Sequence, residues 1–338
     1  MLSTLLPLGS LLLAAAPTAQ PQQAELIVYS SRHYDSDQKL YEAFESETGI
    51  RIKLTEDSGD SLLARLKDPN APGDVLMTVD AGRLWAADEA GLFQPTRSAV
   101  LEERIPENLR HQEGHWFGLS MRARCIFYNR ERVSPSELTD YESLADPKWK
   151  GRVLIRSSSN VYNQSLVGSV IARRGKETAE AWVKGLVANF ARKPQGGDTD
   201  QLRALAAGEG DVAVANSYYY ARLMKSDDPK DKEVVQRVGI FFPNQKGRGT
   251  HVNVGGAGVL KASKNVDAAK RFLEFLASDR AQTIFSSGNN EFPVVPGVAC
   301  DAALKPWTEY RFDQKTSVAE FGSLTGEALR MMDRAGWR

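Results

Sequence analysis

The stretch ELIVYSSRHYDSDQKLYEAFESETGIRIKLTE, residues 25–56, decides the fold class. It opens with a short apolar run, Glu25–Ser30, which is typical of a buried strand. Apolar residues then recur at helical spacing over Ser36–Glu47, and Gly49 is placed to end that helix. Ile50–Thr55 alternates as a second strand. A strand, a helix and a strand in this order predict a parallel sheet with a right-handed crossover.

The same alternation continues through the rest of the chain, without an internal repeat or a low-complexity tract. We expect further strands at residues 74–79, 121–129, 152–155, 211–215, 238–242 and 252–260. We expect further helices at residues 61–66, 83–90, 162–173, 178–189, 198–207, 218–225, 266–277 and 279–286. Two such α/β units in series predict a bilobal protein with a cleft between its lobes.

Composition excludes several classes of protein. The 338 residues suggest about two domains of ~150 residues each. The 43 basic and 43 acidic residues balance, which argues against electrostatic capture of nucleic acid or an anionic membrane. With two Cys, four His and no C-x-x-C or H-E-x-x-H, a Cys-rich zinc site or a zincin is nearly excluded.

The first 22 residues are expected to be a signal peptide. No charged side chain precedes Glu25, and apolar runs are followed by small residues in an A-x-A-like pattern near Ala16 and Ala19. Pro7 and Gly9 interrupt the apolar run, which is shorter than a ~20-residue membrane span, and the usual basic start is missing. Export would permit a disulfide between the two cysteines, Cys125 and Cys300, although their spacing says nothing about proximity.

Tyrosines gather where strands of the predicted sheet end. In open α/β sheets, ligands bind beyond the carboxyl ends of the strands. Three segments occupy such positions, at residues 30–34, 156–162 and 216–222, and five of the ten tyrosines fall within them: Tyr34, Tyr162, Tyr218, Tyr219 and Tyr220.

Clustered phenols suit a hard cation. Fe(III) favours anionic oxygen donors, and coordination drives the deprotonation of phenols. The candidate phenolates are Tyr34, Tyr162, Tyr218 and Tyr219, with His33 as an imidazole donor. Four phenolates and Fe(III) sum to −1, so a nearby arginine would offset the excess charge. The arginines in or near the right segments are Arg32, Arg122, Arg124 and Arg222.

Plainer interpretations stand beside this one. Tyr is enriched at strands and clefts because its ring packs while its hydroxyl pairs, so three consecutive Tyr are more often packing residues than ligands. The Ser157–Asn160 run fits a helix N-cap or an anion site. His111 and His115 have the spacing to chelate a metal on a helix, but Gly114 and the polar surroundings indicate an exposed turn.

Several segments resemble the periplasmic ferric-ion-binding proteins of ABC importers, the Fbp/Fut-type solute-binding family. The similarity covers nearly all of the mature chain. LADPKWKGRV (144–153) resembles a sequence found widely in this class of binding protein. The other similar segments are VYSSRHYDSD (28–37), SSSNVYNQSL (157–166), ANSYYYARL (215–223), NVGGAGVLKASKN (253–265) and EFPVVPGV (291–298).

The resemblance implies both a fold and a set of ligands. The fold is the type 2 periplasmic-binding fold, with doubly wound α/β lobes joined by crossing strands. One lobe would hold residues 24–122 and 248–290, and the other residues 123–247 and 291–338. The family's ligands carry over to His33, Tyr34, Tyr218 and Tyr219, and Tyr162 matches the cyanobacterial branch with four phenolates. The paired-Tyr motif uses the first two Tyr after Asn-x, which leaves Tyr220 outside the set.

The resemblance also implies a function. A monomeric periplasmic protein would capture ferric iron, close its lobes and deliver the ion to an inner-membrane ABC permease, without enzymatic activity or nucleic acid. Two alternatives remain open at this stage. One is a binding protein of the same fold for a polyamine, sugar or oxyanion. The other is a thiaminase-like transferase that would use Cys125 as its nucleophile.

Overall fold

A computed structural model describes residues 24–32 and 34–338. The predicted signal peptide, residues 1–22, and the candidate ligand His33 lie outside the described residues. In the part of the chain that is described, no helix has the length and apolar character needed to cross a bilayer.

An eight-stranded mixed sheet organises the molecule. β1 pairs in parallel with both β2 and β3, as the sequence predicts. β8 is antiparallel to β3 and β4, so the sheet is not parallel throughout. Its strand order is β2 (Arg51–Glu56), β1 (Glu25–Ser30), β3 (Val75–Val79), β8 (Val252–Val259), β4 (Phe117–Asn129), β6 (Val212–Asn216) and β5 (Val153–Leu154), with β7 (Val238–Phe241) paired to β4.

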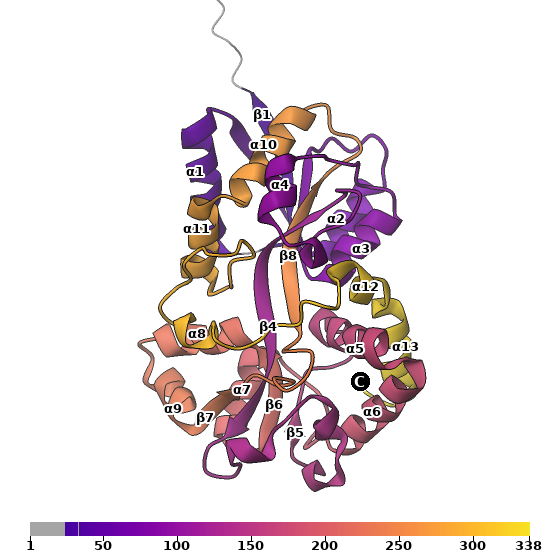
Figure 1. Cartoon of the computed structure of the whole chain (residues 1–338), viewed down its shortest axis with the longest axis vertical. Coiled ribbons are helices and arrows are strands. Elements are labelled where there is room, and N and C mark those ends of the chain that lie inside the picture. Colours follow the sequence, from indigo (N-terminus) through magenta and orange to yellow (C-terminus); the bar gives the residue numbers. More distant parts are fainter. Residues whose placement is uncertain (1–23, 33) are drawn as a thin grey trace, which may run out of the picture.

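Two strands connect two lobes (Figure 1). β4 is buried along its whole length. Its residues 117–123 pair with β8, whereas residues 124–129 pair with β6 and β7. β4 and β8 therefore run from one lobe into the other. The first lobe carries α1 (Gln38–Thr48), α2 (Gly59–Leu66), α3 (Ala81–Glu89), α4 (Ala99–Arg104), α10 (Val266–Leu276) and α11 (Asp279–Asn289).

The second lobe surrounds β5, β6 and β7. Its helices are α5 (Val161–Arg174), α6 (Lys176–Ala188), α7 (Asp198–Ala206), α8 (Ser217–Lys225), α9 (Pro229–Arg237) and α13 (Thr325–Arg334). α12 (Val318–Ser323) contacts both α3 and α5, so it lies between the lobes. The sequence did not predict α4, α9, α12 or α13.

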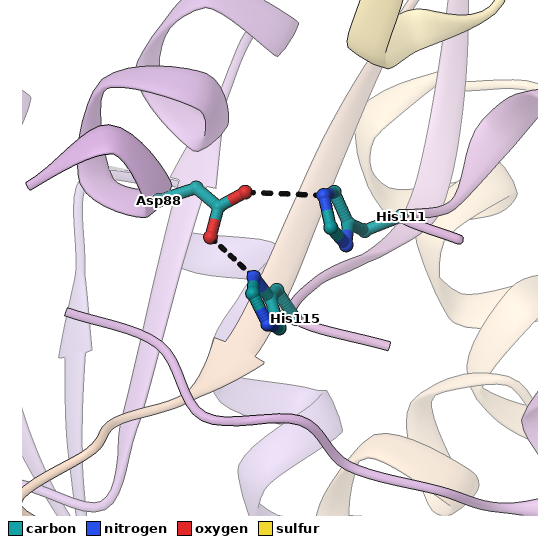
Figure 2. Close-up of side chains that lie close together, drawn as sticks. All are labelled: Asp88, His111 and His115. Atoms are coloured by element: carbon teal, nitrogen blue, oxygen red, sulfur yellow. Dashed lines mark hydrogen bonds and ion pairs between the residues drawn. The ribbon is translucent and has the colours of Figure 1, made fainter. Parts of the chain in front are cut away.

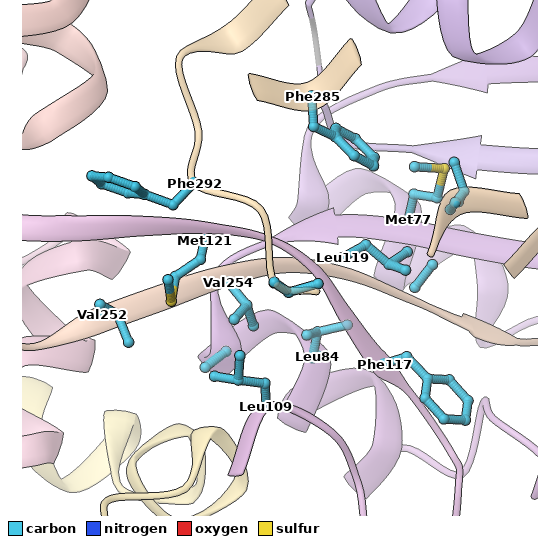
Figure 3. Packing of buried hydrophobic residues seen from close by; sticks show 14 of the residues in the cluster. Met77, Leu84, Leu109, Phe117, Leu119, Met121, Val252, Val254, Phe285 and Phe292 are labelled. Carbon is cyan, nitrogen blue, oxygen red and sulfur yellow. The ribbon is translucent and has the colours of Figure 1, made fainter. Parts of the chain in front are cut away.

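The crossing strands are packed on both sides by a continuous hydrophobic core (Figure 3). Met121 of β4 is paired with Val254 of β8 and Phe117 with Ala257, and Phe292 extends the cluster toward the second lobe. Gly258 lets β8 approach its neighbours closely, because a Cβ there would lie 2.3 Å from the His115 carbonyl oxygen. The connection between the lobes is thus a tightly packed ribbon rather than a loose linker.

The two cysteines are not bonded to each other. Cys125 is buried within β4, and Cys300 is partly buried. The disulfide that export would permit is therefore absent. Burial also raises the pKa of the Cys125 thiol well above its usual value, which disfavours the reactive thiolate.

Candidate functional site

Four tyrosines converge where the two lobes meet. Tyr34 follows β1 in the first lobe, Tyr162 lies in the first turn of α5, and Tyr218 and Tyr219 lie in the first turn of α8. The hydroxyl oxygens of Tyr162 and Tyr218 are 3.4 Å apart, and the rings of Tyr218 and Tyr219 have centroids 4.1 Å apart. The Arg222 guanidinium carbon lies 5.2 Å from the Tyr34 ring centroid and 5.0 Å from that of Tyr218. The structure therefore brings these four predicted residues together.

The side chain of Tyr220 does not join this group, although it lies on the same helix as Tyr218 and Tyr219. β6 ends at Asn216, and α8 begins at the next residue. The Tyr220 hydroxyl donates to the carbonyl oxygens of Val235 and Val238, at 3.2 and 2.7 Å. Its ring packs against Phe127 of β4. Tyr220 thus holds α8 against the sheet.

The tyrosine hydroxyls lie in a desolvated environment. Tyr218 is 1% exposed and Tyr162 is 8% exposed. Burial is the main cause that raises the pKa of Tyr34, Tyr162, Tyr218 and Tyr219. Mutual repulsion adds to this effect, because Tyr162 and Tyr34 both raise the pKa of Tyr218. The phenols are consequently protonated at neutral pH, and only a strong cation would displace their protons.

A buried network of arginines and carboxylates borders the tyrosines on the first-lobe side. Arg32 Nε lies 2.6 Å from Asp37 Oδ2, and Arg32 Nη2 lies 3.0 Å from Glu291 Oε2. Arg122 Nη2 pairs with the other oxygen of Glu291. Burial alone would raise the pKa of Glu291, but Arg32 and Arg122 outweigh it and hold that pKa at about 2. Glu291 is therefore an anion between two cations at neutral pH.

A second ion pair borders the tyrosines on the other side. Arg124 Nη1 lies 2.7 Å from Asp198 Oδ2, and Arg156 Nη1 lies 3.7 Å from Asp198 Oδ1. The guanidinium carbons of Arg124 and Arg156 lie 6.0 and 5.8 Å from the Tyr162 ring centroid. These two arginines share one carboxylate.

Arg222 differs from the other arginines at the tyrosines. Among residues 24–32 and 34–338, it has no carboxylate within ion-pair distance, whereas Arg32, Arg122 and Arg124 each have at least one. Its guanidinium lies within 5.8 Å of the ring centroids of Tyr34, Tyr218 and Tyr219. Arg222 is thus the predicted arginine whose charge is not already paired.

Comparison with known proteins places the chain in a family. A family model described as "Bacterial extracellular solute-binding protein" matches residues 70–312. The chain belongs to this family. One solute-binding relative is "Iron uptake protein A2" of Synechocystis sp. (strain ATCC 27184 / PCC 6803 / Kazusa), which is 52% identical over 336 residues, covering 98% of this chain and 95% of the relative.

Solved structures confirm the predicted fold of this solute-binding protein. "Trichodesmium (IdiA) (FutA) in complex with iron and citrate ligands" aligns with a TM-score of 0.90 at 54% identity, over 93% of this chain and 100% of that chain. "Ferric binding protein from Campylobacter jejuni" aligns with a TM-score of 0.87 at 40% identity, over 93% of this chain and 100% of that chain. The bilobal type 2 periplasmic-binding fold is therefore established.

The sequence of this solute-binding protein did not reveal the carboxylates that pair with the arginines of the site. Asp37, Asp198 and Glu291 pair with the predicted arginines, but none was singled out. Two of them lie within quoted family segments, VYSSRHYDSD and EFPVVPGV, and that is the signal that would have found them. Asp198 is the first residue of α7, and no local motif marks it. Arg156 was also missed as a neighbour of Tyr162.

Proposed function

We propose that this solute-binding protein captures ferric iron in the cleft between its lobes and delivers it to an inner-membrane ABC permease. The ligands in this proposal are the phenolates of Tyr34, Tyr162, Tyr218 and Tyr219 and the imidazole of His33. The observation that carries the proposal is the convergence of four phenols from both lobes, three of them with their rings beside Arg222. Export to the periplasm and action as a monomer are part of the same proposal.

The chemistry of these donors supports iron as the bound ion. Fe(III) is a hard cation, and several phenolate oxygens are donors that it favours over the donors of soft metals. The names and descriptions of the relatives point the same way, since they mention iron uptake, ferric binding and a complex with iron and citrate. The buried carboxylates beside the tyrosines, Asp37, Asp198 and Glu291, are each paired with an arginine, so they do not offer the free anions that a polyamine would need.

The division of the ligands between lobes suggests how binding would close the cleft. Tyr34 belongs to the first lobe, whereas Tyr162, Tyr218 and Tyr219 belong to the second. Iron held by the second lobe would recruit Tyr34 and His33, while β4 and β8 bend as the hinge. The proposed lobe boundaries are residues 24–122 with 248–290, and residues 123–247 with 291–338. The closed form would then dock on the permease.

The nucleophile expected for the transferase alternative, Cys125, is inaccessible. Cys125 is fully buried within β4, and burial raises its pKa. A catalytic Cys requires a partly exposed thiolate beside a base or cation. We therefore do not propose an enzymatic role for Cys125.

A direct test is titration of the iron-free protein with ferric citrate. We expect a visible phenolate-to-iron charge-transfer band that saturates at one ion per chain. Binding should weaken as the pH falls, because protons compete with iron for phenols whose pKa values are already raised by burial. Fe(II) should bind more weakly because of its lower charge. A colourless protein without bound iron after ferric citrate treatment contradicts the proposal.

Removing the unpaired cation should weaken ferric binding. The ferric site with four phenolates carries an excess charge of −1, and Arg222 lies close to three of their rings. A unit charge at this range is worth roughly 10-fold in affinity or more, at an effective dielectric of about 20. We expect Arg222→Gln to show this loss in competition with citrate. Lys225→Gln removes a cation from the same helix that already pairs with Asp301, and it should bind iron normally. Equal affinities in the two variants would contradict the role of Arg222.

A further inference from the structure

A second group of metal-binding side chains lies outside the cleft (Figure 2). Asp88 is on α3, and His111 and His115 are in the loop that precedes β4. His115 Nδ1 lies 2.6 Å from Asp88 Oδ1, and His111 Nε2 lies 3.3 Å from Asp88 Oδ2. One ligand atom from each residue lies within 4.8 Å of the others. Both imidazoles therefore present a nitrogen to the same carboxylate.

The loop holds the two imidazoles in place. The backbone N–H of Gly114 donates to the His111 carbonyl oxygen at 3.0 Å, and the N–H of His111 donates to the Trp116 carbonyl oxygen at 3.0 Å. Gly114 has a φ of +75°, and a Cβ there would lie 2.6 Å from the Thr96 carbonyl oxygen. The turn thus requires glycine at this position. It stacks the His111 and His115 rings at 4.5 Å with an interplanar angle of 7°.

The charge of Asp88 is not balanced by an arginine or lysine. Within residues 24–32 and 34–338, its carboxylate pairs only with the two imidazoles. The Asp88 carboxylate therefore faces imidazole nitrogens rather than a cationic side chain, and a bound cation would compensate its charge.

The cluster is accessible from solvent. The side chains of Asp88, His111 and His115 are 12%, 17% and 21% exposed. His111 lines an open surface cavity of about 730 Å³ whose walls include three acidic residues, Glu107, Glu113 and Glu320, and one basic residue, Arg110. Glu113 Oε2 also lies 3.7 Å from His115 Nε2. An approaching cation would meet an acidic rim before it reached the three ligands.

We propose that Asp88, His111 and His115 form a binding site for a divalent first-row transition-metal cation such as Zn²⁺, separate from the tyrosine cleft. Imidazole and carboxylate together suit Zn²⁺ and its neighbours, whereas Fe(III) prefers the phenolates. The ion would lie among Asp88, His111 Nε2 and His115 Nδ1, with water at the remaining positions. Rotation of the two rings out of their parallel stack would bring the ligand atoms to about 2.1 Å from the metal.

Binding would change the tautomer of His111. The backbone N–H of Glu113 now donates to His111 Nδ1 at 3.2 Å. A metal at Nε2 moves the ring proton to Nδ1, so Nδ1 stops accepting this bond. The amide of Glu113 is therefore expected to shift in the nitrogen–proton NMR spectrum when Zn²⁺ binds.

The test is calorimetric titration of the protein with zinc chloride at pH 7.5, after loading with ferric citrate so that the tyrosines do not compete. We expect one Zn²⁺ per chain, a higher melting temperature in its presence and the Glu113 amide shift. Asp88→Asn keeps the shape of the ligand but removes its charge, and it should lower zinc affinity at least about 10-fold. His115→Gln should do the same.

The matched control is Glu89→Gln, which removes an exposed carboxylate next to Asp88 on the same helix and should bind zinc normally. A melting curve and a ferric titration for each variant show whether the protein is folded. The ferric titration also measures the tyrosine cleft separately from the zinc site. Equal zinc affinity in Asp88→Asn and in the unmodified protein would overturn the site. Zinc binding lost equally in Glu89→Gln and Asp88→Asn would indicate only a diffuse acidic surface and would also overturn it.

Discussion

Tyr218→Phe/Tyr219→Phe is expected to lose at least about 100-fold in ferric affinity, because even the loss of a supporting group near a metal costs about 10–100-fold. The double variant removes two of the five proposed ligands. It should also lose most of the charge-transfer absorbance, since that band arises from phenolate bound to iron. The measurement is ferric citrate titration followed by absorbance, with a competing chelator to extract affinity.

The same substitutions should leave the fold almost unchanged. Phe keeps both rings, and the hydrogen bond that disappears between the Tyr162 and Tyr218 hydroxyls is a long one of 3.4 Å. A typical hydrogen bond contributes about 1 kcal/mol, so the free energy of unfolding should fall by about that amount or less. Loss of iron binding would then reflect the missing oxygens rather than unfolding.

Tyr220→Phe is the matched control. It removes a hydroxyl from the same helix, but that hydroxyl donates to Val238 at 2.7 Å and faces away from the other phenols. We expect normal iron binding with a stability loss of about 1 kcal/mol. Unchanged affinity in the double variant, or an equal loss in Tyr220→Phe, would contradict the ligand assignment.

The tyrosine cluster could be predicted from the sequence because ligand-binding residues in α/β sheets follow the carboxyl ends of strands. Tyr34, Tyr162 and Tyr218 each follow the end of a strand, and strand ends in an α/β sheet face a common edge. The runs that form β1 and β6 are short, apolar and rich in β-formers, so their ends can be read from the sequence alone. The convergence of the four phenols follows from this topology.

The acidic partners could not be predicted in the same way. Arg32 pairs with Glu291, which lies 259 positions later in the chain. That ion pair depends on β8 and the segment after α11 returning antiparallel beside β4, and antiparallel pairing at this separation leaves no periodic signal. α12 was missed for a related reason, because a helix of six residues is too short to show a periodicity.

The histidine cluster shows the same limit. The spacing of His111 and His115 raised the possibility of a helix, but Gly114 indicated a turn, and the structure confirms a turn at Gly114. Asp88 comes from a helix that precedes them by more than twenty positions. A turn stacks the two rings as a helix would not, and only the tertiary structure brings the carboxylate between them.

Glu291→Gln is expected to be among the most destabilising single substitutions in the described chain. Glu291 is fully buried and contacts both Arg32 and Arg122. Removing one member of a buried ion pair costs about 3–5 kcal/mol, because an uncompensated charge stays in the interior. Asp37 still pairs with Arg32, so the larger penalty falls on Arg122. Urea unfolding at pH 7 measures the loss. Glu180→Gln breaks an exposed pair with Lys184 and is the control, with no measurable change expected.

The acid dependence of stability provides an independent measurement of the same group. The pKa of Glu291 falls from an ordinary 4.5 to about 2 in the folded protein, so the folded state holds fewer protons than the unfolded state between these values. Its contribution is therefore fully present above about pH 4.5 and is lost as the pH falls toward 2. By linkage it amounts to about 3 kcal/mol. The difference in unfolding free energy between the unmodified protein and Glu291→Gln should shrink over that range. A difference that stays constant from pH 6 to pH 3 would show that Glu291 is not the anion between the two arginines.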